Sequence, residues 1–209
     1  MERREAVKYI SILLGGAVIG ADAFITGCKT KTGNPQEWSA DDIAYLDEIT
    51  ETILPRTTTP GAKDAKVGQF MTVMVNDCYE ESDQKVFREG MNKLNDLAQK
   101  TYSTSFMKLT PQQRHDLLVP LDKEAKDYQK KVDDFNKQEN AKEKEETAKG
   151  NLKYVGQHMS PHYFFIMKQL TMLGYFTSKI GMTQALRYEP VPGRYDGCVP
   201  YKKGEKAWA

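Results

Sequence analysis

The amino-acid sequence predicts an all-α protein: an irregular helical domain, preceded by an export signal and ending in an ordered loop rich in proline and glycine. Three observations support this fold class. Apolar residues recur at helical spacing through most of the chain. Two capping boxes mark helix starts, and the composition changes near both ends. We therefore expect a signal at 1–27, a tether at 28–37 and a helical domain at 38–209.

The N-terminal segment has the pattern of a lipoprotein export signal. The twin arginine Arg3 and Arg4 precedes an apolar run over Tyr9–Ala21, and Ile25–Cys28 resembles a lipobox, with small residues just before a cysteine. The alternative is a membrane-spanning helix, but the apolar run is short and contains glycines, which disfavours it. We expect cleavage before Cys28 and lipidation of its thiol.

A lipidated Cys28 predicts attachment to a membrane. Two or three acyl chains anchor a protein firmly, because a single chain binds only marginally. Lys29–Glu37 is polar and contains glycine and proline, which suits a short flexible tether. The expected location is the periplasmic face of a bacterial membrane.

Charge and cysteine content narrow the possible partners. The 30 lysines and arginines nearly balance the 29 aspartates and glutamates, so no basic field predicts nucleic-acid binding. With Cys28 lipidated, Cys78 and Cys198 remain, and an even pair in an exported protein predicts one disulfide. The alternative is two buried free thiols.

The first part of the domain predicts three helices. Ser39–Leu54 opens with a capping box between Ser39 and Asp42 and ends at Pro55. A loop rich in threonine, proline and glycine follows. Apolar residues at helical spacing over 67–78 predict the second helix, and Ser82 begins the third.

A second capping box, Thr110 to Gln113, predicts a helix with proline at its first position and a kink at Pro120. The charged stretch Asp122–Lys149 contains few large apolar residues. It predicts a solvated helix or a mobile hairpin that projects from the domain. The alternative is a charged docking arm, although the mixed charges favour no ligand.

The next helix is expected to begin at Ser160–Pro161, to cover His162–Ile180 and to end at a cap on Gly181. Apolar residues cover most of its circumference. Such a helix is buried centrally, or is buried on one side and contacts a partner on the other.

The segment from Arg187 to Pro200 alternates proline, glycine and aromatic residues with charges, and predicts ordered turns. Tyrosines and arginines in such a loop are typical interface anchors. The alternative is a tail that only packs over the core. We expect a partner to contact this loop and the preceding helix through Phe164, Tyr175, Phe176, Arg187, Tyr188, Arg194 and Tyr195.

The sequence contains none of the usual motifs for cofactors. A dinucleotide fingerprint and a c-type haem motif are missing, and two cysteines cannot supply four thiolates to an iron–sulfur cluster. His158 and His162 have the spacing of helical metal ligands, but Pro161 lies between them at the expected helix start. We expect no metal, no cofactor and no catalytic residues in this chain.

Eight segments, spread over nearly the whole chain, together match the pattern of one known family. They are Arg3–Ala6, Ile53–Pro55, Thr59–Ala62, Val75–Tyr79, Phe106–Arg114, Leu170–Ser178, Gln184–Tyr188 and Pro190–Cys198. Through these segments the chain resembles the gluconate 2-dehydrogenase subunit 3 family. The charged stretch 122–149 is longer than in many relatives.

The resemblance implies an accessory role. Small subunits of this family accompany a flavin-dependent large subunit of the glucose-methanol-choline type, often with a multihaem cytochrome c. The large subunit carries the FAD and oxidises a sugar, a sugar acid or a glycoside. The small subunit carries no cofactor, and its twin-arginine signal can export a folded partner. The alternative is a stand-alone periplasmic lipoprotein that binds a small ligand between its helices.

Overall fold

The computed structural model describes residues 37–191, 193–195, 197–200 and 202–208. The expected signal, with Arg3, Arg4 and Cys28, lies outside these residues. The chain divides into two units, 1–37 and 38–209, and only the second is described below. Within the described residues every regular element is helical, as predicted. The elements are α2 (Ala40–Ile53), α3 (Val67–Cys78), α4 (Glu81–Tyr102), η1 (Phe106–Lys108), α5 (Pro111–Ala148), α6 (Tyr163–Thr177) and η2 (Gly181–Ala185).

Helix α2 begins at the predicted capping box. The side chain of Ser39 accepts from the N–H of Asp42, and the Asp42 carboxylate accepts from the N–H of Ser39. The helix N-terminus thereby gains two of the partners that it lacks internally. The loop after α2 is ordered by Glu51, whose carboxylate accepts from the N–H groups of Arg56 at 2.8 Å and Lys63 at 2.9 Å.

A side chain of α2 supplies the hydrogen-bond acceptor that caps the N-terminus of helix α3. Its first flanking residue, Lys66, has left-handed backbone geometry and supplies no side-chain cap. Asp47 takes this role from across the interface, because its carboxylate accepts from the N–H of Gly68 at 3.0 Å. A Cβ at position 68 would lie 2.5 Å from the same carboxylate oxygen, so glycine is required for this close approach.

Helix α5 also begins at its predicted capping box, Thr110 with Gln113. Arg114 in its first turn joins three elements: its guanidinium pairs with Glu48 of α2 and donates to the carbonyls of Phe106 and Met107 in η1. The helix continues through Pro120 to Ala148 as one element of 38 residues.

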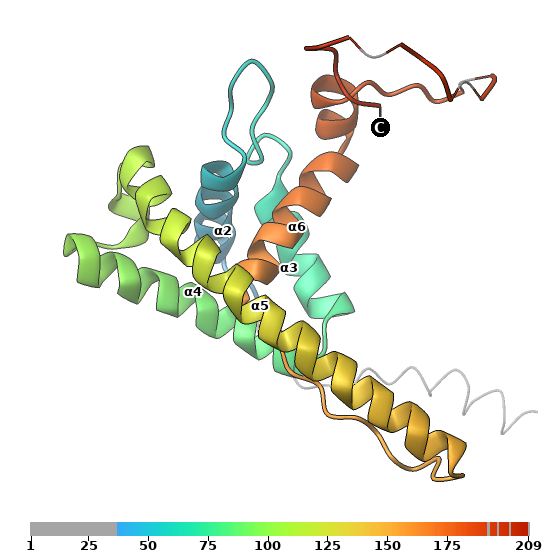
Figure 1. Cartoon of the computed structure of the whole chain (residues 1–209). Coiled ribbons are helices and arrows are strands. Elements are labelled where there is room, and N and C mark those ends of the chain that lie inside the picture. Colours follow the sequence, from blue (N-terminus) through green and yellow to red (C-terminus); the bar gives the residue numbers. More distant parts are fainter. Residues whose placement is uncertain (1–36, 192, 196, 201, 209) are drawn as a thin grey trace, which may run out of the picture. The chain divides into compact units, whose positions relative to one another are not determined.

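The charged half of α5 forms an arm with the segment that follows it. Residues 150–161 return along the helix (Figure 1). Backbone N–H groups of this return segment donate to side chains of α5: Met159 to Asn136 at 2.9 Å and Gln157 to Glu139 at 3.2 Å. The hydroxyl of Tyr154 also donates to Glu139 at 3.3 Å. The charged stretch is thus helical, and its polar side chains hold the chain that leads back to the core.

Helix α6 is shorter than the sequence predicted. It begins at Tyr163, with Nδ1 of His162 accepting from the N–H of Phe164 at 3.2 Å, and it ends at Thr177. The predicted cap at Gly181 is wrong. Ser178 ends the helix, because its hydroxyl accepts from the N–H of Gly181 and donates to the carbonyl of Tyr175. Such local side-chain bonds compete with the helical backbone ladder.

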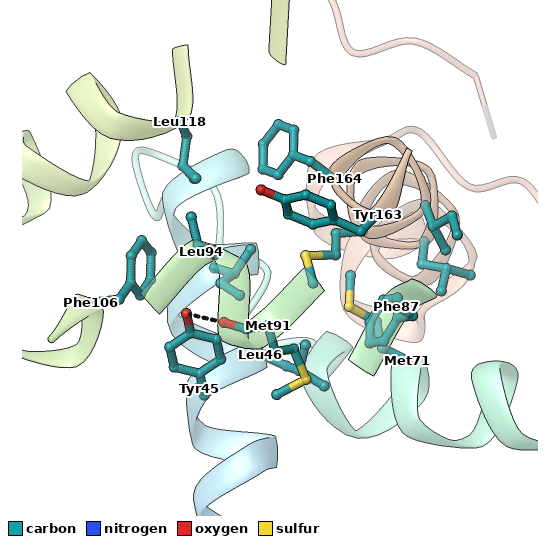
Figure 2. Packing of buried hydrophobic residues seen from close by; sticks show 14 of the residues in the cluster. Tyr45, Leu46, Met71, Phe87, Met91, Leu94, Phe106, Leu118, Tyr163 and Phe164 are labelled. Carbon is teal, nitrogen blue, oxygen red and sulfur yellow. Dashed lines mark hydrogen bonds between the residues drawn. The ribbon is translucent and has the colours of Figure 1, made fainter. Parts of the chain in front are cut away.

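The core lies where α6 meets α2, α3, α4 and the first half of α5 (Figure 1). Figure 2 shows aromatic and sulfur-containing side chains from these helices in contact. Tyr45 packs edge-on against Phe106, with ring centroids 5.4 Å apart, and its hydroxyl donates to the carbonyl of Met91 at 3.2 Å. Burial raises the pKa of Tyr163 to about 12, so its phenol stays neutral inside the core.

Two glycines let α6 approach its neighbours closely. A Cβ at Gly90 of α4 would overlap the side chain of Tyr163, and a Cβ at Gly174 of α6 would lie 2.5 Å from the ring of Phe70 on α3. Interiors packed this densely do not yield space for an added methyl group without moving a helix.

The Gly90→Ala variant tests the contact between α4 and α6. Alanine favours an isolated helix by up to about 1 kcal/mol over glycine. We expect a net destabilisation of about 1–3 kcal/mol because the added methyl group overlaps Tyr163. Urea unfolding of the purified protein measures it. Asn92→Ala, at an exposed position of the same helix, is the control and should not destabilise. Unchanged or increased stability in Gly90→Ala would contradict the packing argument.

The arm on α5 should open at low pH. Hydrogen bonds from Lys142 and from the N–H of Gln157 hold the pKa of Glu139 below its ordinary value of 4.5. The carboxylate therefore stabilises the arm above that value, and the stabilisation is lost as the pH falls through the lowered pKa. The hydrogen-exchange protection factors of 154–159, which are corrected for the slower intrinsic exchange in acid, should fall at acid pH and, in Glu139→Gln, already at neutral pH. Equal protection in wild type and variant at neutral pH would contradict this prediction.

Candidate docking surface

Among the described residues, no three His, Cys, Asp or Glu side chains lie close enough together to hold a metal ion. His158 is exposed, whereas His162 caps α6 and lies against Tyr163, with ring centroids 4.3 Å apart. Burial lowers the pKa of His162. In the part of the chain that the structure covers, no helix is long and apolar enough to cross a lipid bilayer.

Helix α6 has an apolar face that the domain leaves uncovered. Met172 and Leu173 are 40% and 47% exposed, and Phe165 and Phe176 are half-buried. The opposite face packs into the core through Ile166, Met167 and Leu170. The helix is therefore buried on one side only. Large apolar side chains grouped on a surface mark sites of protein contact.

Two residues expected to contact a partner belong to the core instead. Phe164 is 2% exposed and Tyr175 is 4% exposed. The hydroxyl of Tyr175 donates to the carbonyl of Pro60 at 2.6 Å and fixes the loop after α2 against α6. The sequence could not separate these residues from the exposed ones, because α6 is apolar around most of its circumference. Phe176 lies beside Tyr175 at the edge of the outer face.

A hollow of about 510 Å³ lies beside the outer face of α6. Apolar side chains supply most of its walls, with Tyr79 on one side and α5 on the other. Asp122 of α5 accepts from Lys168 at 2.6 Å and from Lys126 at 2.7 Å. Burial alone would raise the pKa of Asp122, but the hydrogen bonds from the two lysines outweigh it and lower the pKa. This carboxylate is therefore ionised at neutral pH.

The C-terminal segment follows α6 and η2. The N–H of Arg187 donates to the carbonyl of Ala207 at 2.8 Å, and its guanidinium lies over the ring of Trp208, 4.1 Å from the centroid. Tyr188 is 49% exposed and Tyr195 is 97% exposed; Arg194 is also exposed. The sequence prediction missed Trp208, because its contact joins residues 21 positions apart without any periodic signal.

The predicted disulfide between Cys78 and Cys198 is absent from the structure, where both residues are exposed. Helix geometry gives a reason. Gly174, near the C-terminal end of α6, faces Phe70 in the first half of α3. Cys78 ends α3 about 12 Å further along its axis, at 1.5 Å per residue, with its sulfur 4.0 Å from that of Met74. The C-terminal segment, which contains Cys198, follows the C-terminal end of α6, and this end lies beside Phe70 rather than beside Cys78.

Comparison with known proteins identifies the family. A model of the gluconate 2-dehydrogenase subunit 3 family matches residues 40–193. No curated protein and no solved structure matches the chain significantly. The matched range contains α2 to α6, η2 and the first residues of the C-terminal segment. The match confirms the resemblance that the sequence motifs indicated, and the chain belongs to the gluconate 2-dehydrogenase subunit 3 family.

Proposed function

We propose that this chain is the accessory small subunit of a periplasmic, membrane-associated dehydrogenase whose catalytic subunit is a flavoprotein of the glucose-methanol-choline type. The family match over all the described helices carries the proposal, since the family takes its name from a subunit of an oxidoreductase complex. The uncovered apolar face of α6 supports it, because exposed apolar patches often mark sites of contact with another protein.

The proposal divides the chemistry between subunits. The catalytic partner binds FAD and oxidises a sugar, a sugar acid or a glycoside. The electrons then pass to a c-type cytochrome subunit or to quinone. The chain described here holds no cofactor and no catalytic residue; it supports the export, assembly and stability of the flavoprotein.

Export and anchoring belong to the N-terminal segment. In the proposal, Arg3 and Arg4 direct the folded complex through the twin-arginine route, so a partner without its own signal crosses the membrane with its flavin bound. Cleavage before Cys28 and lipidation of its thiol then hold the complex at the periplasmic face of the membrane.

Export of the partner should depend on the twin arginine. Replacing Arg3 and Arg4 together by lysine keeps the charge but removes the recognised pair. We expect both this chain and the flavoprotein to remain in the cytoplasm, as measured by fractionation and immunoblotting of the native host. Lys8→Arg is the control and should leave export intact. A flavoprotein that reaches the periplasm normally beside the double variant would contradict the carrier role.

Association should depend on the exposed tyrosine of the C-terminal segment. Tyr195 is 97% exposed, so its removal should leave the fold unchanged. Large anchors of this type often contribute more than about 2 kcal/mol to binding. We expect Tyr195→Ala to retain less flavoprotein in an affinity pull-down, and Arg194→Ala to act in the same direction. Leu152→Ala, an exposed apolar position in the return segment, is the control.

The opposite outcome of the pull-down would remove the C-terminal segment from the proposed interface. If Tyr195→Ala and Arg194→Ala are folded by circular dichroism and retain the flavoprotein at wild-type strength, the C-terminal segment does not contribute to the interface.

A further inference from the structure

The hollow beside α6 combines an apolar interior with an unbalanced charge at its rim. Leu170, which is 2% exposed, is among the residues that line it, with Phe165 and Tyr79 beside it. Met172 and Leu173 keep 40% and 47% of their surface in water. At about 510 Å³ the hollow lies within the size range of ligand-binding pockets, roughly 300–1,000 Å³.

The rim carries one more positive than negative charge. Lys126 and Lys168 both bond to the single carboxylate of Asp122, at 2.7 and 2.6 Å. One ammonium group therefore stays without a compensating charge among the residues that line the hollow. A second carboxylate placed between the two lysines would complete an alternating set of four charges. Covering the hollow would strengthen this attraction, because the effective dielectric constant falls as water leaves.

From these two observations we infer that the hollow is a socket for an acidic, apolar segment of the catalytic partner: one large apolar side chain enters beside Leu173, and a neighbouring carboxylate bonds to Lys126 and Lys168. The inference rests on the proposed accessory role and specifies the chemistry of the docking site. The occupant follows from charge complementarity. The two lysines would repel a basic segment. A purely apolar segment would remove the excess positive charge from water without pairing it, which costs free energy.

The socket also explains why the ion cluster lies at this place. Asp122 joins α5 to α6 through Lys168 and is itself 23% exposed at its side chain. The cluster therefore holds one wall of the hollow in position before the partner arrives. A site formed in advance loses less conformational freedom on binding.

Charge reversal and apolar replacement test the socket in the native complex. An affinity tag on this chain retains the flavoprotein from detergent-solubilised membranes, and the amount retained is measured against the NaCl concentration. We expect Leu173→Asp to lower the apparent affinity by about tenfold or more. Lys126→Glu should lower it by about fivefold at low salt, with the difference from wild type shrinking as the salt concentration rises.

Two matched controls accompany these variants. Lys130→Glu reverses a lysine one turn further along α5, which pairs with Asp127 outside the hollow. Leu152→Asp places the same new charge at an exposed leucine of the return segment. Both controls should retain the flavoprotein like wild type. Circular dichroism checks the fold of each variant, and Lys126, whose side chain is 62% exposed, can be reversed without disturbing the core.

A photo-crosslinking amino acid in place of Met172 identifies the occupant directly. We expect a crosslink to a segment of the flavoprotein in which a large apolar residue is next to Asp or Glu. A crosslink to a second copy of this chain, or to a lipid, would overturn the inference.

The outcomes separate the socket from the accessory role. If wild-type protein retains no flavoprotein, the proposed function fails. If the flavoprotein is retained equally by wild type, Leu173→Asp and Lys126→Glu, the accessory role stands and the socket does not.

Discussion

The close approach of α6 to its neighbours determines the arrangement of the other described helices. Tyr163 lies against Gly90 at one end of α6, and Gly174 lies against Phe70 towards the other. Both contacts need the missing Cβ of a glycine, so the helix can adopt few other positions. This constraint also decides which side chains of α6 remain outside: with Ile166, Met167 and Leu170 in the core, Met172 and Leu173 are left uncovered by the rest of the described residues.

The loop after α2 belongs to the same assembly. Its sequence, Pro55 to Pro60, contains little that could form a core. It is instead ordered by polar contacts from its two neighbours. Glu51 of α2 accepts from the N–H of Arg56 in the loop and from the N–H of Lys63 just after it, and Tyr175 of α6 donates to the carbonyl of Pro60. These contacts give a structural role to parts of the Thr59–Ala62 and Leu170–Ser178 segments by which the family resemblance was found.

The elements with local signals could be predicted from the sequence. Ser39 and Thr110 begin α2 and α5 as expected, because a capping box involves residues only three positions apart. The orientation of α6 could not be predicted, since its apolar residues give no preferred face and the deciding contacts come from Gly90 and Phe70, far away in sequence. For the same reason Phe164 and Tyr175 were expected at the interface and lie in the core, whereas the hollow with Asp122 and Lys168, which are 46 residues apart, was not foreseen.

The arm built from the second half of α5 and its return segment has a consequence for how the chain can change in length. Its hydrogen bonds join the helical half of the arm to the return segment. At the base, the N–H of Met159 donates to Asn136, and near the tip the side chain of Asn151 donates to Glu146. One more helical turn lengthens α5 by about 5.4 Å, and two residues of extended return chain cover that distance at about 3.3 Å each. Insertions or deletions of about six residues can therefore be absorbed at the tip, and α6 keeps its place while the arm reaches further or less far from the domain.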